Sequence, residues 1–338
     1  MIPFSLSVQT VVAARVLLSP DTYLYIGWGI LALLTLIGLL VLWRCRNNCR
    51  RRWLRWLVAV VVPLLWVAFV YGAYVGPYQL EVRHVELTFD DLPPAFDGYR
   101  IVQFGDAHVG TLTGRRRQIL ERAVDSINAQ RADLVVFTGD LQNKKPVELM
   151  PFVDLLSSIE AKDCVYSVKG NHDYPMYIDN EVEKLDDIDV RRMLDDRIGW
   201  RVLDNIHYSV QRGDAKIHIA GMENDGDGER FPQKGNIQKA LRGIMRDEFV
   251  VMLEHDPTAW RRKILPQCHA QLTLSGHTHG GQVALFGLSP ASLVYKESHG
   301  LYTVGGRCLN VTSGLSGVVP FRLGVPPEIV VITLKCKK

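Results

Sequence analysis

The sequence predicts an α/β fold of two sheets covered by helices, preceded by two membrane-spanning helices. Two long apolar runs without charge lie near the start, and after residue 77 short apolar runs alternate with amphipathic helical patterns. The final third, in which Gly and Pro separate short apolar runs, indicates antiparallel β-structure. A length of 338 residues, 47% of them hydrophobic, allows about two structural units at about 150 residues per domain.

The two apolar runs predict a transmembrane hairpin. Residues 23–43 are 21 residues without a charge and residues 57–76 are 20, close to the ~20 that a helix needs to cross a bilayer. Tyr and Trp lie near the ends of both runs, as is typical of membrane interfaces. Residues 2–18 are also apolar but are interrupted by polar side chains and Arg15, so an interfacial segment and a third span are equal alternatives.

The charge distribution predicts an orientation for this hairpin. Six arginines and no acidic residue lie in residues 44–55, between the two apolar runs. A short basic loop stays in the cytoplasm, so the chain after Pro77 is expected on the periplasmic or extracellular side of a bacterial inner membrane; the opposite topology is the alternative. From Pro77 onward the chain has 32 basic and 35 acidic residues, and this balance argues against a nucleic-acid-binding surface there.

We treat residues 1–76 as a membrane region and residues 77–338 as one domain. Residues 115–130 predict an amphipathic helix with an apolar face of Ile119, Leu120, Ala123, Val124 and Ile127. Further helices are expected at 147–159, 181–196 and 236–245. The expected strands cover 81–89, 99–104, 133–138, 164–169, 249–254 and 271–275, followed by 301–304, 308–312 and 328–334 in the final third.

Five of the expected buried strands end in polar clusters. These are Asp106 with His108, Asp140, Asn171 with His172 and Asp173, His255 with Asp256, and His277 with His279. Ligands of open α/β sheets bind at the carboxyl ends of the strands, so the five clusters are expected to meet at one edge. His, Asp and Asn without Cys suit Mn, Fe or Zn rather than a thiolate zinc site. We interpret Cys164, Cys268, Cys308 and Cys336 as buried small residues, and Cys45 and Cys49 as loop thiols.

The ordered motifs Asp106-x-His108, Gly139-Asp140, Gly170-Asn171-His172-Asp173, His255 and Gly276-His277-x-His279 resemble the signature of the calcineurin-like metallophosphoesterases over residues 99–282. Residues 301–307 and 326–329 further resemble the bacterial membrane-anchored or exported branch of that superfamily. The resemblance implies a four-layer α-β-β-α sandwich with two divalent metal ions. It assigns Asp106, His108, Asp140 and His279 to one metal, and Asp140, Asn171, His255 and His277 to the other.

The resemblance also implies roles for the remaining motif residues. A hydroxide held between the metals would be the nucleophile, and His172 would bind the phosphoryl oxygen or protonate the leaving oxygen. For Asp173 a catalytic role and a turn-stabilising role are equal alternatives, and Asp256 is expected to be structural. Protein Ser/Thr phosphatases of the superfamily continue the second motif as Asp-x-x-Asp-Arg-Gly, whereas this chain has Asn143 and Lys144 at those positions, which disfavours that activity.

The expected function is therefore hydrolysis of a phosphomonoester, phosphodiester or pyrophosphate bond beside a membrane, where a lipid-linked or envelope phosphate is a reasonable substrate. A UDP-diacylglucosamine pyrophosphatase of lipid A synthesis is one alternative, although that reaction faces the cytoplasm and the arginine loop argues against it. A non-catalytic membrane-bound binding module of the same fold is the other alternative; it would lack one or more of the seven expected ligands, and all seven are present.

Overall fold

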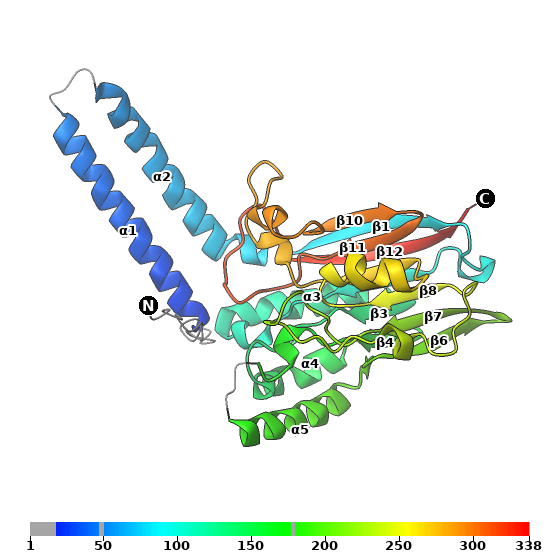
Figure 1. Ribbon diagram of the computed structural model, residues 1–338. Coiled ribbons are helices and arrows are strands. Elements are labelled where there is room, and N and C mark those ends of the chain that lie inside the picture. The colour runs from blue at the N-terminus through cyan, green and yellow to red at the C-terminus, as the bar shows by residue number, and fades with distance from the viewer. Residues whose placement is uncertain (1–17, 47–50, 177–179, 338) are drawn as a thin grey trace, which may run out of the picture.

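The computed structural model describes residues 18–46, 51–176 and 180–337, and its first feature is a helical hairpin that projects from a globular domain (Figure 1). The hairpin consists of α1 (Pro20–Cys45) and α2 (Arg52–Tyr74), both long and apolar enough to cross a membrane. The helices pack through Trp28, whose ring lies 4.9 Å from that of Phe69, and through the Trp66 indole, which donates to Thr35 Oγ1 at 2.9 Å.

Among the described residues, contacts between the hairpin and the domain lie at one end of the hairpin. Arg116 pairs with Asp21 of the first turn of α1 at 3.0 Å, and the Arg322 amide donates to the Gly72 carbonyl near the end of α2 at 2.8 Å. Arg46 and Arg52 lie at the opposite end of the hairpin, separated from the domain by the 26 residues of α1, or about 39 Å of helix. Both helices extend beyond the predicted charge-free runs at the loop end, because arginine is a good helix former. Residues 2–17 and Cys49 lie outside the described residues.

Two six-stranded sheets form the domain. The first has the order β1 (Glu81–Phe89), β12 (Glu328–Cys336), β2 (Arg100–Phe104), β3 (Leu134–Phe137), β4 (Cys164–Ser167) and β5 (Arg201–Val202). The second has the order β10 (Gly300–Val304), β11 (Arg307–Val311), β9 (Leu272–Ser275), β8 (Val250–Leu253), β7 (Ala215–Gly221) and β6 (Ile206–Arg212). Their facing sides share one core, in which Ile101 and Leu134 of the first sheet belong to the same buried cluster as Val251 of the second.

Helices cover both outer faces, which confirms the predicted four-layer sandwich. Against the first sheet pack α3 (Arg117–Ala129), α4 (Val153–Ser157) and α5 (Glu181–Ile198). The apolar face predicted for residues 115–130 is the buried face of α3. Against the second sheet pack α6 (Ile237–Ala240) and the π-helical turn η9 (Trp260–Ile264), which continues into α7 (Leu265–Gln267).

Three local predictions were wrong, and one hairpin was missed. The final third is not wholly antiparallel: β11 runs parallel to β9, and β12 runs parallel to β1 but antiparallel to β2. Residues 147–159 divide into the 3-10 helix η7 (Pro146–Phe152) and α4, because Pro151 lacks the amide that a continuous α-helix needs. The helix expected over residues 236–245 ends at Ala240, and Gly243 follows with a φ of 89°. The β6–β7 hairpin was not predicted, although Gly213, at a φ of 61°, marks its turn.

Of the cysteines, Cys45 and Cys308 are buried, whereas Cys164, Cys268 and Cys336 are only partly so. The prediction of buried cysteines therefore holds for Cys308 and only in part for the other three. The prediction that Cys45 is a loop residue was wrong, because it is the last residue of α1.

Candidate metal centre

The polar clusters meet where β2, β3 and β4 of one sheet and β8 and β9 of the other end. The local backbone is unusual: the ligand candidates with a left-handed φ, between 40° and 74°, are Asp106, His108, Asp140, His277 and His279. Non-glycine residues rarely adopt this conformation, and such strain concentrates at functional sites. Glycines make the close approach possible, since a Cβ at Gly170 would collide with the Asp140 carboxylate.

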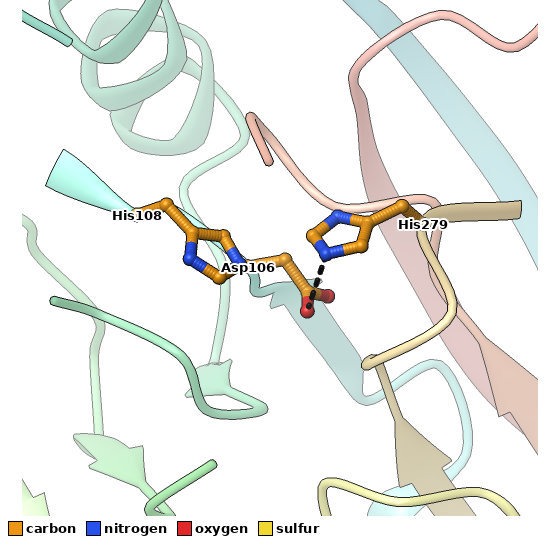
Figure 2. Close-up of side chains that lie close together, drawn as sticks. All are labelled: Asp106, His108 and His279. Atoms are coloured by element: carbon orange, nitrogen blue, oxygen red, sulfur yellow. Dashed lines mark ion pairs between the residues drawn. The ribbon is translucent and has the colours of Figure 1, made fainter. Parts of the chain in front are cut away.

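The first group comprises Asp106, His108 and His279, which come from the loop after β2 and the turn after β9 (Figure 2). His279 Nε2 lies 3.8 Å from Asp106 Oδ1, and the His108 and His279 rings are 5.1 Å apart. Asp106 and His108 are fully buried, and neither ring nitrogen of His108 has a hydrogen-bond partner among the described residues. A buried imidazole with two unsatisfied nitrogens fits a metal ligand, because leaving them unpaired in the apoprotein is costly.

The second group comprises Asp140, His255 and His277, with Asn171 beside them. Asn171 Oδ1 lies 3.2 Å from His255 Nε2 and 2.9 Å from His277 Nδ1. The Asp140 carboxylate joins the two groups, because its Oδ2 lies 3.5 Å from His108 Nε2 and 3.2 Å from His255 Nε2. The structure thus brings together all seven side chains that the sequence identified as metal ligands.

Hydrogen bonds outside the site fix which ring nitrogen faces inward. His255 Nδ1 donates to the Thr138 carbonyl at 2.7 Å, and His279 Nδ1 donates to the Ser316 carbonyl at 3.1 Å. In both rings Nε2 is therefore the nitrogen available to a metal, held by the kind of outer hydrogen bond that metal-ligating histidines usually make. His277 has the opposite orientation. Its Nδ1 faces Asn171 Oδ1, and its Nε2 lies 3.7 Å from Asp256 Oδ2 and 3.3 Å from the Tyr295 hydroxyl.

The protonation equilibria of the site are strongly perturbed. Burial lowers the pKa of His108 to about 3, with the charge of His172 acting in the same direction, and burial likewise lowers the pKa of His279. Burial raises the pKa of Asp106 to about 7. Burial opposes a charge on His255 too, but its hydrogen bond and attraction to Asp140 raise its pKa to about 10. Neutral imidazoles next to buried carboxylates form a donor set suited to divalent cations, which displace the remaining protons.

His172 lies at the edge of both groups. Its Nδ1 donates to the Asn143 carbonyl at 2.7 Å, its amide donates to Asp140 Oδ1 at 2.8 Å, and its ring lies 4.7 Å from that of His108. Because the carbonyl fixes the proton on Nδ1, Nε2 is the nitrogen that can accept or return a proton at the site. Sequence reasoning missed the Asn143 carbonyl, since a backbone contact between two loops leaves no mark in the residue types.

The Asp173 carboxylate binds backbone amides of two loops. Its Oδ1 accepts from the amides of Leu141 and Gln142 at 2.9 and 3.2 Å, and its Oδ2 accepts from those of Asp140 and Gly170 at 2.8 and 2.9 Å. Arg191 of α5 forms an ion pair with Asp173 Oδ1 at 2.6 Å. This residue was not identified from the sequence. Asp256, expected to be structural, accepts from the Thr258 amide and hydroxyl through Oδ1.

A comparison with family models decides the assignment: the calcineurin-like phosphoesterase model matches residues 99–281. This chain belongs to the calcineurin-like phosphoesterase family. It is a metal-dependent phosphoric ester hydrolase with four-layer architecture, and its His and Asp groups fit a dinuclear metal site.

Two relatives are similar to most of this chain. The uncharacterized metallophosphoesterase YkuE of Bacillus subtilis is 31% identical over 78% of this chain and 89% of its own length. A transmembrane protein with metallophosphoesterase domain from Danio rerio is 29% identical over 80% of this chain. The matched part is 60% of the Danio rerio protein, so this chain spans about three-fifths of that relative. A solved structure from Thermus thermophilus aligns over 64% of this chain and 90% of its own, with 15% identity and a TM-score of 0.41.

Proposed function

We propose that this metallophosphoesterase hydrolyses a phosphomonoester, phosphodiester or pyrophosphate bond at two metal ions while anchored in a membrane by α1 and α2. The observation that carries the proposal is the position of Asp140 between His108 and His255, 3.5 and 3.2 Å from its Oδ2. One carboxylate so placed can bridge two cations that lie ~3.5–4 Å apart.

In this proposal the ligands divide between the two ions as the resemblance implies. Asp106, His108, Asp140 and His279 would hold one ion. Asp140, Asn171, His255 and His277 would hold the other. When bound, two divalent ions such as Mn, Fe or Zn activate water and neutralise the charge of the phosphate. The candidate ligands are His, Asp and Asn side chains without a Cys thiolate. This ligand set favours a site for Mn, Fe or Zn of the catalytic kind over a structural zinc site built from thiolates.

His172 supplies the proton transfer in this proposal. Its Nδ1 is fixed on the Asn143 carbonyl at 2.7 Å, so in the protonated ring Nε2 carries the proton that the leaving oxygen can take. Asp173 acts as a positioning residue. Its carboxylate joins the loop that carries Asp140 to the loop that carries Asn171 and His172, because its Oδ2 accepts from the backbone amides of Asp140 and Gly170.

The arrangement of the hairpin supports an extracytoplasmic site. Arg46 and Arg52 lie at the end of the hairpin remote from the domain, so a spanning hairpin separates the basic loop from the metal centre (Figure 1). With the basic loop in the cytoplasm, the domain lies on the periplasmic or extracellular side of an inner membrane, beside lipid-linked or envelope phosphates.

The test is hydrolysis by the full chain in detergent, stripped of metal and then supplied with Mn, Fe or Zn. Bis-p-nitrophenyl phosphate and p-nitrophenyl phosphate distinguish diester from monoester activity, and Asp140→Asn measures contaminating phosphatase. Turnover that requires metal and Asp140 supports the proposal. Metal-loaded protein that hydrolyses neither compound would contradict the proposed hydrolysis of monoesters and diesters. A C-terminal reporter that is active in the cytoplasm would reverse the topology and favour the UDP-diacylglucosamine pyrophosphatase reaction.

A further inference from the structure

The segment that follows His279 exposes an unusual amount of apolar surface. Residues 280–295 carry no charge. We call residues 284–294 the apolar loop; its most exposed side chains are Leu285 (60%), Phe286 (104%), Leu288 (76%), Leu293 (89%) and Val294 (78%). Soluble surfaces normally scatter such residues singly, and a contiguous group of them marks an interaction site.

This exposure belongs to a formed structure. Leu285 and Leu288 exchange two backbone hydrogen bonds of 3.0 Å, and between them Phe286 and Gly287 adopt left-handed φ values of 53° and 79°. This tight turn places the Phe286 side chain at its tip. Ser289 Oγ donates to the Gly280 carbonyl at 2.8 Å, which fixes the base of the turn, and the 3-10 helix η11 (Pro290–Leu293) follows.

The apolar loop is linked to the domain end of α2. The Ala284 amide donates to the Leu323 carbonyl at 2.8 Å, and the Leu323 amide donates to the Gln282 carbonyl at 2.9 Å. One residue earlier, the Arg322 amide donates to Gly72 of α2, and the Phe321 ring lies 5.9 Å from that of Phe69. In Figure 1 the loop, drawn in orange, rises beside the domain end of α2.

The same loop borders the metal centre. It begins a few residues after His279 and is followed directly by Tyr295, whose hydroxyl lies 3.3 Å from His277 Nε2 and whose ring lies 5.7 Å from that of His277. The uncharged segment thus lies beside the metal ligands and is hydrogen-bonded to Leu323, whose neighbour Arg322 binds α2.

We propose that the apolar loop inserts into the surface of the same lipid bilayer that α1 and α2 span. The inference rests on the proposed membrane anchoring. The link to α2 favours the bilayer as the occupant, because backbone hydrogen bonds through Leu323 and Arg322 join the base of the loop to the domain end of a helix proposed to span the membrane. Shallow burial of large apolar side chains without charge is how interfacial segments bind membranes. The insertion holds the rim of the metal centre against the lipid, so that phosphates carried by the bilayer reach it from the membrane surface.

The experiment is photocrosslinking of the full chain in vesicles of phosphatidylethanolamine and phosphatidylglycerol, with p-benzoylphenylalanine at one position at a time. The test variant is Phe286→p-benzoylphenylalanine, and Leu293→p-benzoylphenylalanine is a second position should the first not fold. Val67, which is 67% exposed within α2, reports on the anchoring. Met245, which is 64% exposed and precedes β8 at the end of the sheet opposite the metal centre, is the matched control.

We expect lipid adducts at positions 67 and 286 and a yield at least about tenfold lower at position 245. Adducts at 67 but not at 286 or 293 would overturn insertion of the loop and leave the anchoring intact. Absence of adducts at 67 would overturn the anchoring itself. Adducts at 286 that contain a second protein chain instead of lipid would show that the apolar loop is a dimer contact and would contradict the proposal.

Discussion

The loops after β3 and β4 each carry a buried aspartate, and the two carboxylates have opposite surroundings. Asp140, after β3, lies 3.5 and 3.2 Å from the inward nitrogens of two histidines. Asp173, after β4, accepts from four backbone amides and from Arg191. Both are almost fully buried, so burial does not distinguish them.

The difference between the two aspartates lies in the hydrogen-bond partners of their carboxylate oxygens. The Asp173 oxygens are satisfied by donors of the protein itself, which holds two loops in register. Asp140 Oδ2 instead lies between Nε2 of His255 and Nε2 of His108, and the latter has no hydrogen-bond partner among the described residues. A divalent cation completes such an arrangement. A buried aspartate in this site is thus assigned by the atoms that it meets, and the following variants test that assignment.

Asp140→Asn should have the largest effect. An amide keeps the shape but cannot bridge two cations, so we expect the rate of hydrolysis to fall by at least about 10³-fold. The measurement is the initial rate at saturating metal, with the melting temperature as a check on folding. The exposed Asp154 provides the control, because Asp154→Asn makes the same chemical change in α4 and should leave the rate unchanged. A variant that stays within a few-fold of the parent would remove Asp140 from the centre of the mechanism.

His172→Gln should have the next largest effect and should separate proton transfer from metal binding. Removal of a general acid typically costs about 10²–10⁴-fold in rate, while the seven predicted ligands remain. The loss should be greater for an alkyl phosphate than for a p-nitrophenyl phosphate, because p-nitrophenolate leaves without a proton. Rates for both substrates and the bound metal should be measured together. Equal losses on the two substrates would argue that His172 binds the phosphoryl group instead.

Asp173→Asn should act indirectly, by shifting the two loops that the Asp173 carboxylate joins. In either orientation of the amide, its NH₂ group would face two backbone donors, because each Asp173 oxygen accepts from two amides. We expect unfolding to become easier by about 3–5 kcal/mol. Activity should fall by about tenfold as the loops shift, with the shape of the pH–rate profile retained. Asp195→Asn, on the other side of Arg191 at 2.8 Å, should be milder in both measurements. A changed pH profile in Asp173→Asn would instead assign it a direct part in proton transfer.

Glu328→Gln should affect stability but not catalysis, because this carboxylate resembles Asp173 in having protein partners. Burial opposes its charge, but the His299 hydrogen bond and the charges of His299 and Arg83 lower its pKa from 4.5 to about 2. A lowered pKa stabilises the fold above pH 4.5, and that stabilisation disappears as the pH falls towards 2. It corresponds to about 3 kcal/mol.

The unfolding free energies of the parent and Glu328→Gln should therefore converge by about 3 kcal/mol between pH 5 and pH 2. The hydrolysis rate at pH 7 should be the same for both proteins. A difference in stability that does not change with pH would show that the charge of Glu328 is not what its partners stabilise.

Much of the fold could be predicted, because local patterns encode it. The apolar face of α3 and the buried strands β2, β3, β8 and β9 were expected within about two residues. The direction of β12 could not be predicted, since its pairing with β1 and β2 joins residues that are far apart in the chain. The β6–β7 hairpin was overlooked although its Gly213 turn lies in the sequence.

Some residues of the metal centre could likewise be predicted from the sequence, and others could not. Its motif residues were visible because each follows a short apolar strand. Arg191 was not, because it reaches Asp173 from the middle of α5, and nothing in an i, i+4 pair with Asp195 indicates which loop the helix will cover. The second carboxylate interaction of Arg191 emerges only from tertiary packing.

The most direct test of the account is the number of metal ions that the full chain binds. The protein should be purified in detergent, stripped, reloaded with Mn or Zn, and analysed by elemental mass spectrometry beside Asp140→Asn and Asp173→Asn. The account predicts two ions per chain in the parent and in Asp173→Asn, and at most one in Asp140→Asn. Folded parent protein that binds one ion or none at saturation, or an Asp140→Asn variant that still binds two, would contradict the bridging role of Asp140.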